Sequence, residues 1–503
     1  MKPRYCASIC AAILLIWGVN GCDRGQKESQ PAGIGESLPN IVFILADDMG
    51  YGDVQTFNPG SKIPTPNLNR LAAEGMRFTD AHSGSAVCSP TRYGVVTGRY
   101  SWRTWMKSGV LWPPDDKPLI EADRLTVAGM LKQKGYRTAC IGKWHLGIEW
   151  GRDEQGEVDF NRPIRYGPTD VGFDDFFGIA GSLDMIPYAF YHNREATQPV
   201  TETQQGFPFP RFVREGPRAQ GFDPGKALDE LTEQAVGFVE RCAAADVPFF
   251  LYFPLTAPHK PVWPEERFRG RTELGPYGDF VSQVDWSVGQ VLLALERAGV
   301  VEDTLVVYTS DNGSYMYRWP KDQPDHILDA SVQGYHPAHH TSNSIWRGTK
   351  ADVWEGGHRV PFIARWPRKI NPGTQCDLTI CLTDFMATCA EVVGISLPEN
   401  SGEDSFSLIP LMEGKSRPVP RAPVIHHSSN GTFSLRDGKW KMVFGSGSGG
   451  REKPVGKPFE EPYFLFDMEQ DPSETTNMIE EFPDIAVRLT ERLETIRRSG
   501  RSR

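Results

Sequence analysis

Unbroken hydrophobic runs recur along the chain and end in polar residues. The first run spans residues 41–46, and a strand of this composition is typical of a parallel sheet covered on both faces. Three further runs predict strands at residues 136–141, 249–253 and 304–309. The carboxyl ends of parallel strands meet at one edge of the sheet, where ligands bind in open α/β proteins.

Segments with the spacing of amphipathic helices separate and follow these strands. A helix is expected to begin at Thr65-Pro66-Asn67, with Thr65 as its cap and Leu68 and Leu71 on its buried face. Further helices are predicted at residues 126–134, 228–244, 280–298 and 385–393. This alternation predicts an α/β fold with a large, mostly parallel central sheet flanked by helices.

The pattern changes near residue 418. Short alternating segments predict antiparallel strands at residues 424–427, 432–435 and 440–444, and residues 485–497 predict a closing helix. We therefore expect a large domain at residues 38–417. A smaller α+β subdomain, built on a short antiparallel sheet, is expected at residues 418–503.

The first residues indicate a targeting segment. Lys2 and Arg4 precede an apolar stretch at residues 9–17, which is too short to span a bilayer as a mature helix. The following Val19-Asn20-Gly21-Cys22 resembles a bacterial lipoprotein signal. It implies a signal peptide at 1–21, a lipid anchor on Cys22 and a flexible linker at 22–37. The implied location is the periplasm or the cell surface of a bacterium, with a lipid as the sole link to the membrane. An ordinary signal peptide cut nearby is the alternative.

Composition and net charge exclude some classes of function. Hydrophobic residues make up 39% of the chain and charged residues 23%, which indicates a folded globular protein. The net charge of −10 argues against nucleic acid as a partner, although a local cationic cluster still allows an anionic substrate. The nine cysteines show no metal-ligand spacing, so buried free thiols and at most one disulfide are expected among those outside the motifs.

Oxygen-bearing side chains follow two of the predicted strands. Asp47 and Asp48 come directly after the run 41–46, and Asp311 and Asn312 follow the strand at 304–309. Three carboxylates brought together repel one another unless a cation neutralises them, and all-oxygen ligands favour Ca²⁺ or Mg²⁺ over zinc. Taken singly, each pair would be explained as a strand-end turn. Their convergence predicts a metal site.

Positive side chains and one cysteine are expected at the same edge. Pro90 suits the first turn of a helix, on which Cys88 and Arg92 would share one face at a spacing of i to i+4. A helix N-terminus favours anions. The remaining basic candidates are Lys143, His145, His259 and Lys350. Such a set suits an anionic tetrahedral group, although any one of these residues alone would be assigned to the solvated surface.

Two motifs resemble the signatures of one enzyme family. Cys88-Ser89-Pro90-Thr91-Arg92, followed by Thr97-Gly98-Arg99, resembles the signature of the formylglycine-dependent sulfatases, within the alkaline-phosphatase-like group. The run 142–147, Gly-Lys-Trp-His-Leu-Gly, is similar to the second signature of that family. The resemblance extends from about residue 40 to residue 471 and is strongest to arylsulfatases and N-acetylgalactosamine-6-sulfatases.

The resemblance implies a mechanism. A maturation enzyme would oxidise Cys88 to formylglycine, whose hydrate is the nucleophile. One Ca²⁺ ion would be held by this residue together with Asp47, Asp48, Asp311 and Asn312. Asp311 could also accept the attacking proton. Arg92 and Lys143 would stabilise the hydrate, His259 and Lys350 would grip the sulfate, and His145 would deprotonate the remaining hydroxyl so that sulfate leaves.

The implied substrates are sulfated carbohydrates of the galactose or N-acetylgalactosamine type. Residues 181–185, Gly-Ser-Leu-Asp-Met, resemble a segment of such sulfatases in which an Asp faces the sugar, so Asp184 is a candidate hydroxyl acceptor, with a loop Asp that caps a turn as the alternative. His426 and His427 could reach over the pocket mouth, with a structural role as the alternative. The histidines expected to rim the cleft rather than bind metal are His336, His339 and His340.

Two other functions compete with this interpretation. A phosphatase, phosphodiesterase or phosphonate hydrolase of the same superfamily could use the same cysteine motif. A non-enzymatic glycan-binding lipoprotein could keep the scaffold without the activity. The complete set of candidate catalytic residues argues against the second alternative.

Overall fold

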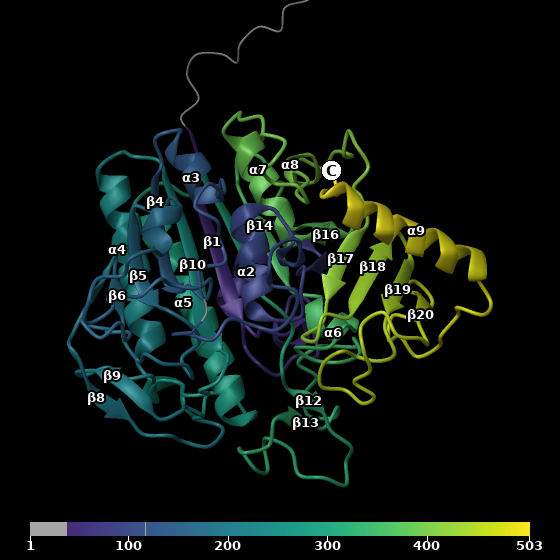
Figure 1. Ribbon diagram of the computed structural model, residues 1–503, viewed down its shortest axis with the longest axis horizontal. Coiled ribbons are helices and arrows are strands. Elements are labelled where there is room, and N and C mark those ends of the chain that lie inside the picture. The colour runs from purple at the N-terminus through teal and green to yellow at the C-terminus, as the bar shows by residue number, and fades with distance from the viewer. Residues whose placement is uncertain (1–37, 116) are drawn as a thin grey trace, which may run out of the picture. The chain divides into compact units, whose positions relative to one another are not determined.

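The computed structural model describes residues 38–115 and 117–503. The predicted signal peptide, Cys22 anchor and linker lie outside the described residues. Figure 1 shows a central sheet with helices along it and a second, smaller sheet in the C-terminal part of the described chain. Among the described residues, no helix is both long enough and apolar enough to cross a bilayer.

The central sheet has ten strands. In spatial order they are β15 (Thr374–Cys376), β2 (Met76–Phe78), β14 (Phe362–Arg365), β11 (Thr304–Ser310), β1 (Asn40–Asp47), β10 (Phe249–Pro258), β4 (Arg137–Lys143), β5 (Asp175–Ile179), β6 (Tyr191–His192) and β7 (Glu195–Ala196). The strands from β11 to β5 run parallel, whereas β14, β2, β6 and β7 include antiparallel pairings. The predicted, mostly parallel sheet is therefore confirmed.

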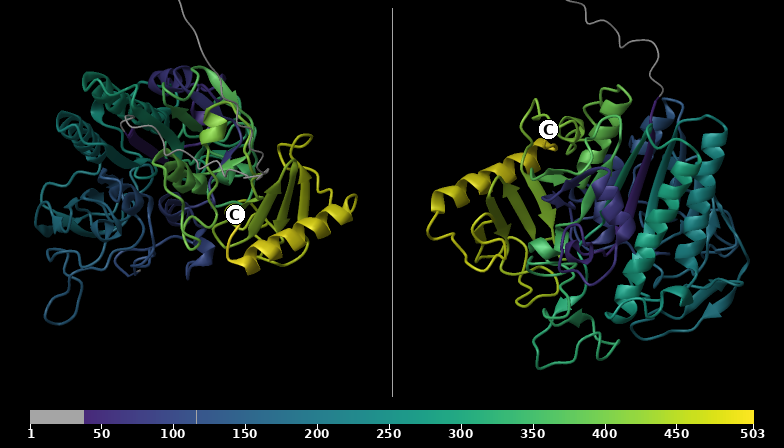
Figure 2. Two further views of the ribbon diagram at one scale, coloured as in Figure 1. Left: turned by 90° about the horizontal axis from the view of Figure 1, so that it is seen from above. Right: turned by 180° about the vertical axis from the view of Figure 1, so that it is seen from behind.

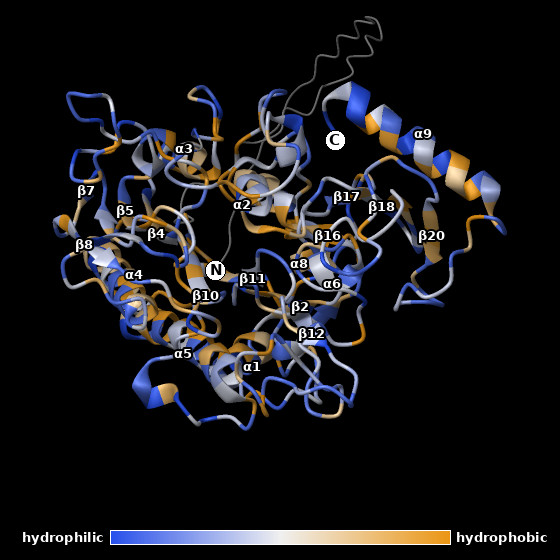
Figure 3. Cartoon of the chain, turned by 60° about the horizontal axis from the view of Figure 1, so that its bottom comes forward, coloured by the Kyte–Doolittle hydropathy of each residue, from blue (hydrophilic) through white to orange (hydrophobic). Residues whose placement is uncertain are grey.

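The central strand β1 explains why its sequence is apolar throughout. It pairs in parallel with β10 on one side and β11 on the other, and every residue of the strand is buried. Helices cover both faces of the sheet, so inward and outward side chains alike leave water. Figure 3 shows hydrophobic colours concentrated along these strands.

Two sets of helices cover the sheet. Helices α1 (Pro66–Ala73), α4 (Ala227–Ala244) and α5 (Gly275–Arg297) pack together on one side. Helices α2 (Cys88–Thr97), α3 (Val127–Lys132) and α7 (Phe385–Val392) pack together on the other. Figure 3 shows α4, α5 and α1 on one side of the strands and α2 and α3 on the other.

Thr65 stands at the N-cap position of α1, as predicted, but its side chain makes no cap hydrogen bond. It accepts one from the Gln55 amide at 3.1 Å instead. The first amides of the helix donate to a side chain from another helix: Asp285 of α5 accepts from Asn67 N at 3.2 Å and from Leu68 N at 2.8 Å. A tertiary contact thus replaces the local cap and joins α1 to α5.

The smaller sheet has four strands with a long helix against it. It comprises β17 (Val424–His427), β18 (Phe433–Asp437), β19 (Trp440–Phe444), β20 (Phe464–Asp467) and α9 (Pro483–Ser499). The three predicted antiparallel strands and the closing helix are confirmed, whereas β20 was not predicted. Figure 2 shows α9 lying along this sheet.

Residues from the large part complete the core of the small sheet. Tyr100 and Trp102, which follow α2, pack in one apolar cluster with residues of β17 to β20 and α9. The predicted boundary between residues 417 and 418 stays a prediction, and apolar contacts cross it.

The remaining elements are short. The strands are β3 (Ala81–His82), β8 (Val200–Gln204), β9 (Gly216–Ala219), β12 (Tyr317–Arg318), β13 (Gly334–Tyr335) and β16 (Ile380–Cys381), and the helices are α6 (Glu355–His358) and α8 (Ile409–Met412). Single 3-10 turns lie at Tyr51–Asp53, Ser101–Arg103, Pro168–Val171, Glu266–Phe268 and Leu382–Asp384. All six cysteines of the described residues are free thiols.

Candidate active site

The carboxyl ends of β1, β10 and β11 meet at one point. The Asp311 amide donates to Ala46 O at 3.0 Å, and the His259 amide donates to Asp47 O at 3.0 Å. Asp48 has a φ of 66°, a left-handed conformation in which β1 ends and the chain turns. The parallel register therefore brings together side chains that are more than 200 positions apart in sequence.

Helix α2 delivers Cys88 to this point. The helix begins at Cys88, as predicted, and all ten of its residues are buried. The Cys88 Sγ lies 3.7 Å from Asp47 Oδ1 and 3.5 Å from Lys350 Nζ. Arg92, one turn later, points to the same centre. The N-terminus of a buried helix adds partial positive charge where an anion would bind.

Three carboxylates pair with three cations around Cys88. Lys143 Nζ lies 2.8 Å from Asp47 Oδ2. Lys350 Nζ lies 2.8 Å from Asp48 Oδ1. Arg92 donates twice to Asp311 Oδ2, at 3.0 Å from Nε and 2.7 Å from Nη2. The pairs lie deep in the protein, with charges balanced one to one.

The pairing shifts the pKa values in the site. Burial alone would raise the pKa of Asp47, but Lys143, His259 and Arg92 together hold it well below its usual range. Burial raises the pKa of the Cys88 thiol to about 12, despite the attraction of Lys143 and Lys350 for a thiolate. As encoded, this cysteine is therefore a poor thiolate nucleophile.

The oxygen donors suit a hard divalent cation. Asp48 belongs to a buried group of potential metal ligands together with Asp47, Cys88 and His259. The amide of Asn312 donates to Asp48 Oδ1 at 2.7 Å, while its own Oδ1 is buried without a hydrogen-bond partner. A buried carbonyl oxygen without a partner is costly and is a ligand type that Ca²⁺ accepts.

Gly313 permits the close packing beside Asn312. A Cβ atom at this position would lie 1.8 Å from Gly356 O. Glycine therefore allows the loop after β11 to approach α6, which follows Lys350 in the chain. This contact helps to bring the Asp311-Asn312 pair and Lys350 to one place.

Two neutral histidines flank the centre. His259 Nδ1 lies 2.6 Å from Lys260 O, so this nitrogen carries the proton and Nε2, 3.7 Å from Asp48 Oδ2, carries the lone pair. Burial lowers the pKa of His259 to about 4. His145 Nε2 donates to Leu111 O at 2.9 Å, and its Nδ1 is buried without a partner. Burial, with the nearby charges of Lys143 and Arg92, lowers the pKa of His145 far below its usual range.

Asp184 adjoins this centre on the His259 side. Its Oδ1 lies 4.0 Å from His259 Nδ1 and has no hydrogen-bond partner. Its Oδ2 lies 2.7 Å from Arg214 Nη1 and 3.9 Å from Lys260 Nζ. Arg214 and Lys260 were not predicted. One sequence feature could have identified Lys260, its position directly after His259. Arg214 lies in an irregular loop without a motif, so no such feature marked it.

His426 and His427 are buried, and both contact the segment that leads into Cys88. His426 Nδ1 donates to Ser83 O at 3.0 Å, and His427 O accepts from the Ala86 amide at 2.9 Å. Strand β17 therefore holds the segment that leads into Cys88. Both side chains are buried, so a contact with substrate stays a prediction that these contacts do not support.

The three histidines predicted to rim the cleft lie around two aspartates. His339 Nδ1 lies 2.6 Å from Asp325 Oδ2, and His336 Nδ1 lies 3.6 Å from the same oxygen. His340 Nε2 lies 2.9 Å from Asp53 Oδ1 and is buried. These contacts fix the loop between β12 and β13 and the segment after it.

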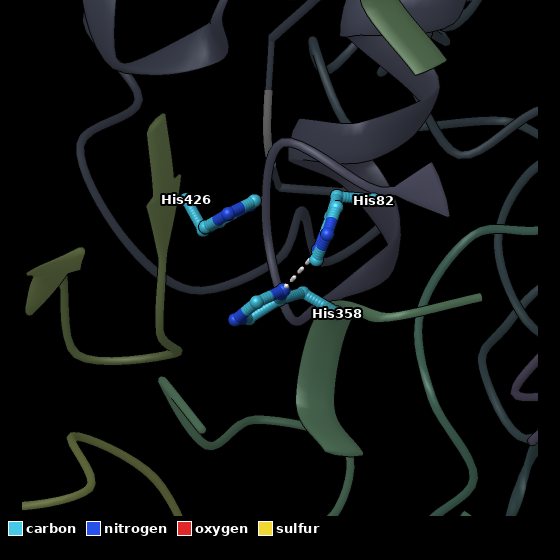
Figure 4. A group of neighbouring side chains, drawn as sticks. All are labelled: His82, His358 and His426. Carbon is cyan, nitrogen blue, oxygen red and sulfur yellow. Dashed lines mark hydrogen bonds between the residues drawn. The ribbon is translucent and has the colours of Figure 1, made fainter. Parts of the chain in front are cut away.

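A second histidine group lies between α6 and β17. Figure 4 shows His82, His358 and His426 facing one another, with a hydrogen bond of 3.1 Å between the Nδ1 atoms of His82 and His358. Three converging imidazoles could hold a metal ion. However, the rings of His358 and His426 are stacked 3.8 Å apart at 9°. Their lone pairs then lie in two nearly parallel planes, so one ion cannot lie in the plane of both rings.

Charged residues at both ends order this group instead. Lys441 Nζ lies 3.1 Å from His358 Nε2 and can only donate. Asp80 Oδ1 lies 2.8 Å from His82 Nε2 and, as a carboxylate, can only accept. A single direction of proton donation, from Lys441 through His358 and His82 to Asp80, satisfies both ends. It leaves Val353 O, 3.0 Å from His358 Nε2, without a proton from that nitrogen. The group is therefore a buried hydrogen-bonded chain that ties β19 to the segment before Cys88.

Comparisons with known proteins agree with this geometry. The family model described as Sulfatase matches residues 39–395, which include the whole group from Asp47 to Lys350. The chain is 31% identical to the N-acetylgalactosamine-6-O-sulfatase of Bacteroides thetaiotaomicron, over 95% of this chain and 96% of that protein. It is 32% identical to arylsulfatase A of Homo sapiens, over 88% of this chain and 83% of that protein.

A solved structure resembles the fold closely. It comes from work on the metabolism of multiple glycosaminoglycans by Bacteroides thetaiotaomicron and matches with a TM-score of 0.79 and 29% identity. The match covers 91% of this chain and 99% of that one, so the small C-terminal sheet is included in the similarity.

Proposed function

The chain belongs to the sulfatase family of sulfuric ester hydrolases, and on that premise we propose that it hydrolyses sulfate monoesters on sulfated carbohydrates. The observation that carries the proposal is the position of Cys88 at the start of a buried helix, within 3.5 Å of Lys350 Nζ and 3.7 Å of Asp47 Oδ1. The cations Lys143 and Arg92 and the imidazole of His259 also lower the pKa of the Asp47 carboxyl group. This environment suits a tetrahedral anion.

A divalent cation fits the charge balance. With three carboxylates matched by Arg92, Lys143 and Lys350, the site is near neutral, so an added Ca²⁺ would give the excess positive charge that a sulfate ester needs. The proposed ligands are Asp47, Asp48, Asp311, Asn312 and the modified Cys88. When bound, the ion supplies Lewis-acid stabilisation of the negative oxygens.

The proposed nucleophile is made from Cys88 by a separate maturation enzyme. Formylglycine supplies, as its hydrate, an attacking hydroxyl and a second hydroxyl that lets sulfate leave by elimination. The high pKa of the unmodified thiol, about 12, supports a need for modification.

The surrounding side chains have distinct proposed roles. Lys350, 3.5 Å from the sulfur that marks the position of the nucleophile, would hold a sulfate oxygen, and His259 would join it once the bound anion favours protonation of its Nε2. His145 is neutral and has a free, buried Nδ1, so it is suited to take the proton of the second hydroxyl. Arg92 and Lys143 would stabilise the hydrate, and Asp311 is a candidate acceptor for the attacking proton.

The proposed substrate class is a sulfated galactose or N-acetylgalactosamine glycan. Relatives named for N-acetylgalactosamine 6-sulfate support this class. Asp184 Oδ1, buried and without a partner beside His259, is the proposed acceptor for a sugar hydroxyl. We also propose export through the segment at 1–21, with lipid attachment at Cys22, so that the enzyme meets its glycan outside the cytoplasm.

Peptide mass spectrometry and one pair of substrates test the proposal. The peptide that contains Cys88 should show formylglycine in protein produced with a maturation enzyme. That protein should hydrolyse a sulfate ester of a phenol faster than the phosphate ester of the same phenol. Cys88→Ala should abolish turnover, whereas Cys376→Ala, which removes a half-buried free thiol from strand β15, should leave it unchanged.

The opposite outcomes identify the competing functions. Faster phosphate cleavage by the modified protein would replace the proposal with a phosphatase or phosphodiesterase. Unchanged turnover in Cys88→Ala would remove this residue from the reaction. A modified protein that binds sulfated sugars without releasing sulfate would be a glycan-binding protein.

A further inference from the structure

Exposure increases stepwise along one chain of contacts that leads away from Cys88. The side chain of His259 is 6% exposed, that of Lys260 is 29% exposed and that of Arg214 is 38% exposed. Trp112, whose ring lies 4.8 Å from the Arg214 guanidinium, is 46% exposed. These residues therefore form a path of increasing exposure from the site to the surface, which we call the mouth.

Asp184 holds the two cations of the mouth unequally. Arg214 Nη1 donates to both Asp184 Oδ2 and Asp184 O at 2.7 Å. Lys260 Nζ lies 3.9 Å from the same Oδ2, beyond hydrogen-bond distance. Among the described residues, Asp184 is the one carboxylate within 4.0 Å of Lys260. The Lys260 ammonium thus keeps its donors available at a partly exposed position.

An aromatic ring lies between the two cations. Lys260 Nζ lies 4.4 Å from the centre of the Phe212 ring, and the Arg214 guanidinium lies 4.9 Å from it. An aromatic face next to cations offers an apolar surface to the C–H groups of a sugar ring and attraction to an anion at its edge.

A third cation approaches from the C-terminal part of the chain. Arg451 Nη1 donates to Tyr315 O at 3.2 Å, and Tyr315 OH donates to Pro258 O, next to His259, at 3.3 Å. Burial lowers the pKa of Lys260. Lys350, Arg451 and Arg214 lower it further, while Asp184 opposes them. The positive charges at the mouth therefore exceed what one carboxylate can neutralise.

We propose that Lys260, with Arg451, binds a second anionic group of the substrate, on the sugar unit next to the one that loses sulfate, while Phe212 contacts that sugar. The sulfate under attack is already met by Lys350 and the buried cations, so the mouth has no need of further positive charge for that group. The second anion would be a uronate carboxylate or a second sulfate. This inference rests on the proposed function and names the substrate class of the same site.

A comparison of four substrates tests the inference on the full, modified enzyme. The substrates are a monosulfated monosaccharide and the same unit linked to a neutral sugar, to a uronate, or to a second sulfated sugar. The wild-type enzyme should show the lowest KM for the two dianionic substrates. Their advantage should fall as salt is raised, because ionic attraction at a partly exposed site is screened.

Single substitutions then identify the residues. Lys260→Met and Arg451→Met, each shown to be folded by a thermal melt, should lower the ratio of kcat/KM for a dianionic over a neutral disaccharide about tenfold, the size of one charge-assisted hydrogen bond. The loss should appear in KM. Lys260→Arg should restore most of the ratio, and Lys62→Met, an exposed lysine that contacts Ala338 O, should leave it unchanged.

Each outcome distinguishes this inference from the proposed function. Equal kcat/KM for the neutral and the dianionic disaccharides overturns the inference and leaves the sulfatase proposal standing. An unchanged ratio in both methionine variants does the same. Preference for the uronate or for the second sulfate identifies the second anion. If the modified enzyme releases sulfate from none of the four substrates, both proposals are wrong.

Discussion

Asn312 shows how a single side chain divides two tasks at the centre of the site. Its amide nitrogen donates to Asp48 Oδ1 at 2.7 Å, and its oxygen is buried without a partner. The nitrogen therefore orients a proposed metal ligand, while the oxygen is free to be one. Sequence position predicted the ligand role but not the orienting contact, because the latter depends on the packing of β1 against β11.

Metal removal should be detectable in stability as well as in activity. We expect the purified protein to contain one Ca²⁺, and chelation to lower both turnover and the thermal midpoint, because a ligand that binds only the folded chain stabilises it by its binding free energy. Asn312→Ala should reduce the stabilisation that added Ca²⁺ provides. Elemental analysis and thermal melts with and without Ca²⁺ measure this. Full activity in metal-free protein would contradict it.

The residues that sequence did not predict lie where the chain leaves regular structure. Lys260 follows strand β10, which ends at Pro258, so the strand alternation that would place its side chain opposite that of His259 no longer applies. Arg214 lies in a loop and forms an ion pair with Asp184, which is distant from it in the sequence. Motif spacing captured the residues on strand ends and on α2, because regular elements fix their direction.

At the scale of elements, α1 depends on a contact with another helix. Asp285→Ala would leave the amides of Asn67 and Leu68 without acceptors at a buried helix start. We expect a loss of about 2–4 kcal/mol in the free energy of unfolding, the cost of two unpaired donors. Thr65→Ala, which removes one hydrogen bond from Gln55, should cost about 1 kcal/mol. Urea unfolding would measure both losses. A larger loss for Thr65→Ala than for Asp285→Ala would mean that the local residue, and not the contact with α5, stabilises the start of α1.

Strand β17 should make the protein sensitive to acid. Burial lowers the pKa of His427 to about 4, from an ordinary value of 6.5. Between these values the unfolded chain binds a proton that the folded chain does not. Stability contributed by this group is therefore present above pH 6.5 and falls as the pH drops towards 4, by about 1.4 kcal/mol per pH unit. The buried His82, His358 and His426 shift in the same direction.

A substitution isolates the contribution of His427. His427→Asn should reduce the pH dependence of the free energy of unfolding between pH 6.5 and 4, measured by urea titration at several pH values. His192→Asn, at an exposed histidine of β6, should keep the wild-type slope. An identical slope in both variants would show that His427 does not titrate in this window.

At the scale of the whole described structure, one buried lysine joins the small sheet to helix α6. Lys441 of β19 lies 3.1 Å from Glu355 Oε1 of α6 and 2.7 Å from Glu474 Oε1. Burial raises the pKa of Glu474 to about 7, which Lys441 opposes. Lys441 is thus the cation that pairs with Glu474, whereas Glu355 also pairs with Arg359, whose Nη1 lies 3.0 Å from Glu355 Oε2.

Removal of that cation should loosen the junction. Lys441→Met would leave the buried Glu474 without its cation and Glu355 with Arg359 in its place, and should cost about 3–5 kcal/mol, a value typical of breaking a buried ion pair from one side. Lys439→Met, at a partly exposed pair with Asp467, should cost far less. Differential thermal melts would measure both. Equal losses of stability in the two variants would mean that the buried ion pairs of Lys441 stabilise the fold no more than the partly exposed pair of Lys439.

Hydrophobic periodicity predicted the strands and helices of this fold better than the contacts between its two parts. The parallel strands, the helices between them and three strands of the small sheet follow from periodicity. The packing of Tyr100 and Trp102 into the core of the small sheet does not, because these residues lie more than 300 positions before the strands they contact. Strand β20 is four residues long and follows an irregular segment, so its sequence gave no clear alternation.

The burial of α2 determines whether modification of Cys88 must come before or after folding. Cys88 is 1% exposed in the folded chain, and its helix is covered on every residue. Under the proposed function, an oxidising enzyme must reach this thiol while the chain is still extended. Folding and modification then compete in time, and a molecule that folds first is permanently inactive. The native fold of the unmodified chain would be a kinetic dead end, so the yield of active protein would depend on the rate of modification and not on stability.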